Sequence, residues 1–223
     1  MDGYAVIFDM DGVLVDSYHA HLKSWQLSAI ALGRMIREEE FVKTFGRVSR
    51  EIIAEHWGAN SMSDEEIAAF DKQKEQLYRD IVAAKFPAMD GAGELLKVLR
   101  EAGFRLAVGS SGPPENVALA VRELGAERLF DTLVTGRDVT RGKPDPQVFL
   151  TAAQKLGISP HKCAVVEDAP VGIAAANAAG MASIALLSTG HTAESVRAAR
   201  HVTTSLRALT PSMIVELIDA QTT

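Results

Sequence analysis

The chain has 223 residues, of which 47% are hydrophobic and 23% charged, with a formal net charge of −6. This acidic balance predicts no nucleic-acid partner, and the single cysteine, Cys163, excludes an internal disulfide or a cysteine-based zinc site and favours a reducing compartment. Neither a signal peptide nor an apolar run near the roughly 20 residues of a membrane-spanning helix is visible, so we expect a cytoplasmic protein without a membrane partner.

Short apolar runs recur along the chain, at 4–8, 105–109, 132–135, 163–167 and 183–187, with a weaker one at 201–204. Most are apolar throughout, which is typical of strands buried on both faces of a parallel sheet. Amphipathic helix patterns lie between them, at 91–103, 114–125, 145–157 and 170–180. This alternation predicts an α/β fold with a doubly wound parallel sheet.

One stretch, 17–86, shows only helical periodicity. It predicts a small helical cap domain inserted after the first strand of a Rossmann-like catalytic core, which we expect to comprise 1–16 and 87–223. The insertion leaves the sheet at the carboxyl end of a strand, where α/β proteins bind ligands. We therefore expect the cap to open and close about hinges near Ser17 and Pro87.

Polar groups of a consistent kind follow four of the predicted strands. They are Asp9 and Asp11, then Ser110, Ser111 and Gly112, then Lys143, and finally Glu167 and Asp168. Because the carboxyl ends of parallel strands lie at one edge of a sheet, positions far apart in sequence are expected to converge there.

The residue types in this set point to phosphate chemistry. Carboxylate oxygens of Asp9, Glu167 and Asp168 suit Mg²⁺, and Lys143 can hold phosphate oxygens. The Ser110 hydroxyl can donate to an anion, and the amides of Ser111 and Gly112 precede a predicted helix start, which favours anion binding. Together these groups predict a phosphoryl-transfer site.

The two aspartates can divide the reaction between them. Asp9, beside the cation, would stay ionised and attack phosphorus, forming an aspartyl-phosphate. Asp11 would serve as general acid and base, a role for which the site must raise its pKa or supply the proton transiently.

Each element has a structural explanation when taken singly. The Asp-x-Asp-Gly sequence can be a turn, the serines a helix cap, and Lys143 a solvated surface residue. Glu167 and Asp168 can be a pair at a helix start, favoured there by the helix dipole. The order and spacing of all four elements, each at a strand end, favour the functional interpretation.

The motifs resemble those of the haloacid dehalogenase-like superfamily of phosphohydrolases, over nearly the whole chain. "DMDGVLVDS" is similar to the first motif of that family, Ser110 to the second and Lys143 to the third. The resemblance implies Asp9 as nucleophile and Asp11 as acid/base. It also implies Mg²⁺ bound through Asp9, the main-chain carbonyl of Asp11 and Asp168, with Glu167 assisting directly or through water.

The helical insertion resembles the small cap of the β-phosphoglucomutase and phosphoglycolate phosphatase branch. This resemblance implies a functional His21 and a phosphate-contacting Arg50 in "VSRE", although a packed histidine and a solvated arginine are the ordinary interpretations. Arg47 is a further candidate contact. Lys72 and Lys74 are also candidates, but we expect both to be surface residues on a charged helix.

The sequence departs from the mutases of this branch after the second-motif serine. Those mutases carry Ser and then Lys-Asn to grip a distal phosphate, where this chain has Gly112, Pro113 and Pro114. We therefore expect a Mg²⁺-dependent phosphatase of a small phosphorylated metabolite. A β-phosphoglucomutase-type isomerase is the alternative, followed by a hydrolytic dehalogenase, which would need neither Asp11 nor Mg²⁺. A monomer is expected, and a dimer also fits.

Overall fold

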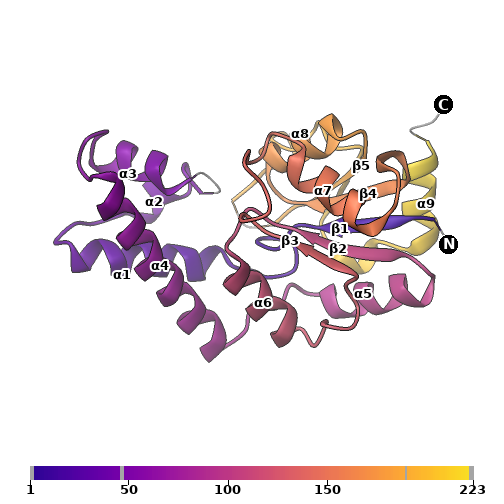
Figure 1. The fold of residues 1–223 in the computed structure, drawn as a ribbon, viewed down its shortest axis with the longest axis horizontal. Helices are drawn as coiled ribbons and strands as arrows, with labels where there is room; N and C mark the ends of the chain where they lie inside the picture. The colour runs from indigo at the N-terminus through magenta and orange to yellow at the C-terminus, as the bar shows by residue number, and fades with distance from the viewer. Residues whose placement is uncertain (1–2, 46–47, 189, 221–223) are drawn as a thin grey trace. The chain divides into compact units, whose positions relative to one another are not determined.

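The computed structural model describes residues 3–45, 48–188 and 190–220. It divides into two compact units, which are described separately (Figure 1). The first comprises Met1–Asp16 and Pro87–Thr223, and the second comprises Ser17–Phe86.

The first unit is built on a six-stranded sheet in which every neighbouring pair is parallel. The strands are β1 (Ala5–Phe8), β2 (Arg105–Gly109), β3 (Thr132–Val134), β4 (Cys163–Glu167), β5 (Ala182–Leu186) and β6 (His201–Thr203). All six lie where the apolar runs predict them, the weaker sixth run included. The doubly wound α/β fold is therefore confirmed.

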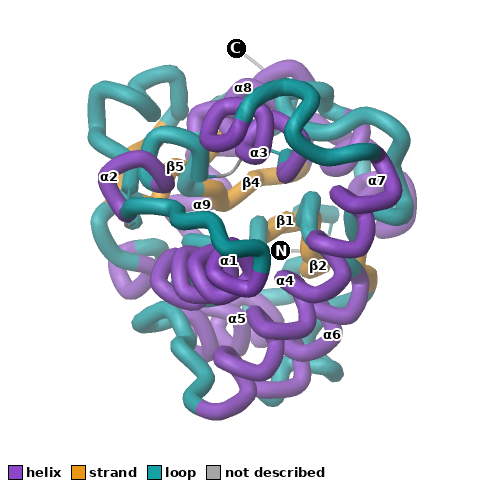
Figure 2. The backbone as a smooth tube through the Cα atoms, turned by 90° about the vertical axis from the view of Figure 1, so that its left-hand side faces the viewer, coloured by secondary structure: helices purple, strands orange, loops and turns teal. Residues whose placement is uncertain are grey.

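The order of the strands, β3-β2-β1-β4-β5-β6, creates a crevice beside the first strand. The chain moves outward from β1 to β3, then returns to the other side of β1 as β4; Figure 2 shows β5, β4, β1 and β2 in that sequence across the sheet. Parallel α/β sheets bind ligands at such a reversal, outside the carboxyl ends of the strands. Residues that follow β1 and β4 are therefore placed at the expected site.

Helices cover both faces of this sheet. They are α5 (Ala92–Glu101), α6 (Pro114–Glu123), α7 (Gln147–Leu156), α8 (Pro170–Ala178) and α9 (Pro211–Asp219), with short 3₁₀ turns at Pro160–Lys162 and Leu206–Ala208. Because side chains alternate along a strand, Ile7 and Val165 point to one face, where they pack with Phe149 of α7 and Ala176 of α8. Figure 1 shows α7 and α8 on one side of the sheet and α5 and α6 on the other.

The second unit is helical, and its described residues include no strand, as the periodicity of 17–86 predicts. Its helices are α1 (Tyr18–Ala31), α2 (Glu38–Phe41), α3 (Ser49–Trp57) and α4 (Asp64–Ala84). Helix α4 begins with a capping box, in which Ser63 Oγ accepts from the Glu66 N–H and the Glu66 carboxylate accepts from the Ser63 N–H. A separate apolar core, which includes Trp25, Phe41 and Phe70, holds these helices together.

Among the described residues, no helix combines the length and the hydrophobicity that crossing a membrane requires. The longest, α4, carries charged residues along most of its length.

Candidate active site

Lys143 is the centre of the candidate site in the first unit. Its Nζ donates to Asp9 Oδ1 at 2.7 Å and to Glu167 Oε1 at 2.6 Å. Asp9 directly follows β1, and Glu167 is the last residue of β4. The lysine side chain is only 8% exposed, so its charge lies beside these carboxylates with little solvent to screen it. The structure therefore contradicts the solvated-surface interpretation of Lys143.

Glu167 and Asp168 extend the cluster. One ligand oxygen from each of Asp9, Glu167 and Asp168 lies within 4.8 Å of the others. Glu167 Oε2 accepts from the backbone N–H groups of Asp168 and Ala169, both at 2.7 Å. Asp168 Oδ2 accepts from Ser188 Oγ at 2.8 Å. The first, third and fourth predicted elements therefore meet at the switch point between β1 and β4.

This crowding of buried charges shifts the ionisation of the site. Burial, together with the charges of Glu167 and Asp11, raises the pKa of Asp9 to about 7 against the opposing attraction of Lys143. Burial and then the charges of Glu167 and Asp9 raise the pKa of Asp168 well above its ordinary value. Burial by itself would lower the pKa of Lys143, but Asp9 and Glu167 outweigh it and raise that pKa, so the ammonium persists.

The donor set fits a hard divalent cation. Three buried carboxylates lie around one ammonium, so the cluster has an excess of negative charge. Carboxylate oxygens are the ligands that Mg²⁺ takes in proteins, and a bound cation supplies the missing positive charge.

Gly12 gives Asp168 the space that it occupies. The backbone of Gly12 has a φ of +76°, and a Cβ there would lie 1.9 Å from Asp168 Oδ2. A larger residue would therefore face both backbone strain and a clash with the Asp168 carboxylate. This requirement explains the glycine in the first motif without recourse to a generic turn.

The second predicted element, the loop after β2, lies beside Asp11. Ser110 is 1% exposed, and its Oγ accepts from the Gly112 N–H at 3.0 Å. The Cβ position of Gly112 is 3.2 Å from Ser110 Oγ and 3.9 Å from Asp11 Oδ2. Ser111 is exposed. The loop therefore brings the Ser110 hydroxyl and the Asp11 carboxylate to the same region of the first unit.

The candidate cap residues His21 and Arg50 both have partners within the second unit. The His21 ring stacks on Tyr78, with centroids 4.1 Å apart and planes inclined by 18°. Arg50 donates to Asp64 Oδ1 at 2.6 Å, although its side chain remains 58% exposed. Arg47 lies outside the described residues. The functional roles of these residues stay predictions.

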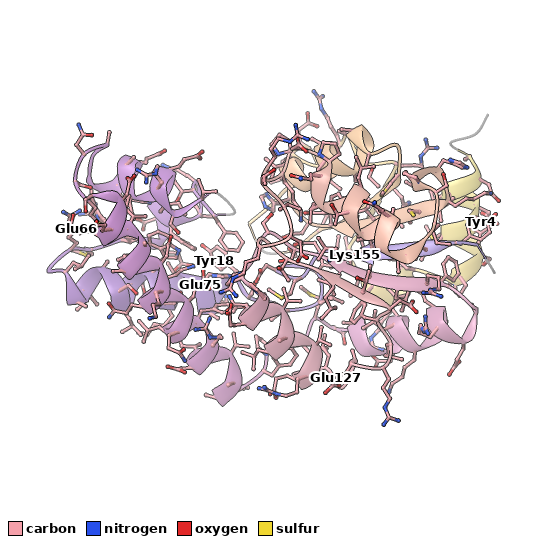
Figure 3. The ribbon with its side chains drawn as sticks, in the orientation of Figure 1. Tyr4, Tyr18, Glu66, Glu75, Glu127 and Lys155 are labelled. Carbon is pink, nitrogen blue, oxygen red and sulfur yellow. The ribbon has the colours of Figure 1, made fainter. Side chains whose placement is uncertain are left out.

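The expectation for Lys74 is wrong, whereas Lys72 is exposed as predicted. The Lys74 side chain is 6% exposed and forms an ion pair with Glu75, which Figure 3 labels. Its Nζ also lies 5.7 Å from the centroid of the Trp25 ring. Lys74 shares the apolar face of α4 with Phe70 and Tyr78, so its aliphatic stem packs inward while its charge is paired.

A doubly wound α/β core with a buried lysine among carboxylates at its switch point defines an enzyme suited to metal-assisted transfer of an anionic group. The comparisons with known proteins agree. A family model described as haloacid dehalogenase-like hydrolase matches residues 5–180.

Individual relatives cover most of the chain. Validoxylamine A 7′-phosphate phosphatase of Streptomyces hygroscopicus subsp. limoneus is 36% identical over 202 residues, 85% of this chain and 88% of that protein. A phosphorylated carbohydrates phosphatase of Thermotoga maritima is 30% identical, over 81% of this chain and 83% of that one. The crystal structure of β-phosphoglucomutase from Clostridium difficile matches with a TM-score of 0.86 at 26% identity, covering 97% of each chain.

The chain belongs to the haloacid dehalogenase-like hydrolase family, in the branch that holds β-phosphoglucomutases and sugar phosphatases. It is a phosphoric monoester hydrolase. The family and branch that the sequence motifs suggest are therefore confirmed.

Sequence reasoning missed Ser188 and Gly172, and it explained Gly12 of the first motif only as a possible turn residue. Ser188 follows β5 and donates to Asp168, while Gly12 and Gly172 leave space beside Asp168 and Glu167. A signal for Gly172 was present, since it is a glycine within an otherwise alanine-rich helix pattern at 170–180. The sequence did not indicate a role for Ser188, because serine is a common residue in the turns that follow strands.

Proposed function

We propose that this chain is a Mg²⁺-dependent phosphatase that hydrolyses the phosphate monoester of a small polyhydroxylated metabolite through an aspartyl-phosphate on Asp9. The observation that carries the proposal is the Lys143 ammonium held between Asp9 and Glu167, with Asp168 in the same cluster. This arrangement gathers a nucleophilic carboxylate and a permanent cation where a phosphate could dock.

In the first half of the proposed reaction, an Asp9 oxygen attacks phosphorus and the bond from phosphorus to the leaving oxygen breaks. Asp11 gives its proton to that oxygen, so the metabolite departs as an alcohol. In the second half, Asp11 takes a proton from water, and the water oxygen attacks the phosphorus of the aspartyl-phosphate. The bond from phosphorus to Asp9 then breaks, which releases inorganic phosphate and restores the carboxylate.

The remaining groups bind and orient the phosphate. Ser110 Oγ accepts the Gly112 N–H, so its own hydrogen can point to a phosphate oxygen, and Lys143 can contact another. Asp9, Asp168 and the main-chain carbonyl of Asp11 would hold Mg²⁺, with Glu167 assisting. When bound, Mg²⁺ supplies positive charge that offsets the phosphate and keeps Asp9 ionised.

The helical unit Ser17–Phe86 is proposed to act as a lid that excludes water and contacts the leaving group, with His21 and Arg50 as contacts. The relatives support a sugar-like leaving group, since one acts on validoxylamine A 7′-phosphate and another on phosphorylated carbohydrates, as their names state. Unchanged X-ray scattering on addition of a metal fluoride phosphate mimic would contradict the lid.

The proposal is tested by measuring phosphate release with Mg²⁺ from a panel of hexose and hexitol phosphates, phosphoglycolate and nucleoside monophosphates. Asp9→Asn should abolish turnover, and Asp11→Asn should nearly abolish it while leaving Mg²⁺ binding intact. Asp80→Asn, at an exposed position of α4, is the matched control and should retain full activity. Turnover by Asp9→Asn at the wild-type rate would overturn the nucleophile assignment.

A mutase is the second candidate, favoured by the likeness to β-phosphoglucomutase. A mutase must hold two phosphate positions alternately, yet Pro113 caps α6 and Pro114 opens it, and neither has an N–H to donate. A coupled assay that converts β-glucose 1-phosphate to glucose 6-phosphate separates the two, because a phosphatase releases inorganic phosphate instead.

A further inference from the structure

The Glu167 carboxylate is enclosed on every side that the structure describes. It is 1% exposed, and its Oε2 accepts the N–H groups of Asp168 and Ala169 where the chain enters α8. Its Oε1 accepts from Lys143 Nζ at 2.6 Å. The side chain is therefore folded back over the start of α8, with one oxygen left to hold the lysine.

This conformation depends on the third residue of α8, Gly172. A Cβ at that position would lie 1.7 Å from Glu167 Oε1 and 2.0 Å from Glu167 Cδ. Gly172 is not among the glycines with positive φ, so its backbone does not require a glycine. Alanine is the better helix former, and the rest of α8 is rich in alanine. The position is therefore explained by the space that the carboxylate needs.

Displacing Glu167 would alter the surroundings of Lys143. The ammonium donates hydrogen bonds to the carboxylates of Asp9 and Glu167. Of these two acceptors, only Glu167 keeps the same bonds throughout the proposed reaction. Without it, the ammonium on the flexible four-carbon stem of Lys143 would keep its hydrogen bond to the nucleophile and its position 4.9 Å from the centroid of the Phe149 ring, and it would lose its second carboxylate partner.

We propose that Gly172 is a positioning residue that acts through Glu167 to fix Lys143 beside the nucleophile, an inference that rests on the proposed phosphatase function. Because Gly172 has no side chain, the Glu167 carboxylate can adopt the conformation described above. That conformation determines the position of the Lys143 ammonium relative to the phosphate being transferred. Gly172 itself touches no reacting atom.

The test is a double-variant cycle on the full chain, measured as phosphate release from the best substrate of the panel. Gly172→Ala should lower kcat by about 10- to 100-fold with little change in KM, because it misplaces a group that acts in the transition state. Glu167→Asp withdraws the carboxylate by one methylene and removes the clash. In that background Gly172→Ala should lower kcat by less than about twofold.

Gly93→Ala is the matched control. Gly93 is the second residue of α5, and a Cβ there would meet nothing within 4 Å. This variant should keep the wild-type kcat and should hold or raise Tm, whereas Gly172→Ala should lower Tm in the wild-type background but not in the Glu167→Asp background. Equal loss of kcat from Gly172→Ala in both backgrounds would overturn the proposal, since it would show a purely local effect on the helix.

A readout independent of turnover separates this inference from the proposed function. The Lys143 side chain is 8% exposed, so an amine-acetylating reagent followed by mass spectrometry should label it slowly in the wild type and faster in Gly172→Ala. Unchanged labelling would refute the positioning role. Failure of the phosphatase proposal would show instead as retained turnover in Asp9→Asn, with the labelling difference still present.

Discussion

The ionisation of Asp9 predicts an unusual dependence of stability on pH when divalent cations are chelated. The folded-state pKa of Asp9 is raised from 3.8 to about 7, mainly because the carboxylate is buried. A carboxylate with a raised pKa keeps its proton in the folded chain after the unfolded chain has lost it. Its contribution to stability is therefore fully present below pH 3.8 and declines as pH rises through about 7.

Asp9→Asn isolates this contribution, because asparagine has nearly the same shape and does not titrate. Between pH 5 and pH 7 the folded wild type holds one proton more than the unfolded chain at this position. Two pH units at 1.36 kcal/mol each give at most about 3 kcal/mol. Asp9→Asn should therefore gain stability relative to the wild type as pH rises from 5 to 8.

The assay is urea denaturation of both proteins in EDTA at pH 5 and pH 8, followed by the same measurement in excess Mg²⁺. Comparing the variant with the wild type at each pH cancels the titration of histidines and other groups that do not interact with Asp9. Mg²⁺ should shrink the difference, since the cation stabilises ionised Asp9. A stability difference that is the same at pH 5 and pH 8 in EDTA would refute the reasoning.

Three further predictions concern other buried or paired groups. Lys143→Met should lower kcat by about 100- to 1000-fold in the phosphate-release assay by removing charge beside the phosphate; a loss below tenfold would contradict its role. Asp138→Asn should cost about 1 kcal/mol at pH 7, because hydrogen bonds from Lys155 (labelled in Figure 3) and Thr135 lower the pKa of Asp138 from 3.8 to about 2. That stabilisation is present above pH 3.8 and is lost as pH falls towards 2, so urea curves of variant and wild type should converge in acid; a constant gap would argue against it. Burial raises the pKa of the Cys163 thiol to about 12, so a thiol reagent at pH 8 should modify it only in denaturant, and rapid reaction of the folded chain would show that the thiol is accessible.

The strands and the chemistry of the core could be read from the sequence because both depend on local signals. Continuous apolar runs marked the strands, and the polar residues that end them were bound to share one edge of a parallel sheet. The pairing of Lys143 with Asp9, 134 residues apart, follows from that topology.

Other features depend on conformations that no local pattern encodes. Lys74 looked like a surface lysine, and only its place on the face that carries Phe70 and Tyr78 explains its burial. Gly172 stands out in the sequence as a glycine within an alanine-rich helix pattern, but the reason for it is the path of the Glu167 side chain, which a sequence does not specify. The roles of His21 and Arg50 remain predictions, because they depend on a bound substrate. The cytoplasmic location and the monomeric state also remain predictions, because they depend on molecules other than this chain.

The base of the insertion is tied together within the first unit. The Asp16 N–H donates to the Pro87 carbonyl at 2.8 Å, and the Met89 N–H donates to the Leu14 carbonyl at 3.0 Å. The chain therefore leaves and re-enters the first unit at neighbouring positions that are hydrogen-bonded to each other. The intervening residues, 17–86, form a separate unit. The sequence of that segment can therefore vary without disturbing the register of the strands in the first unit.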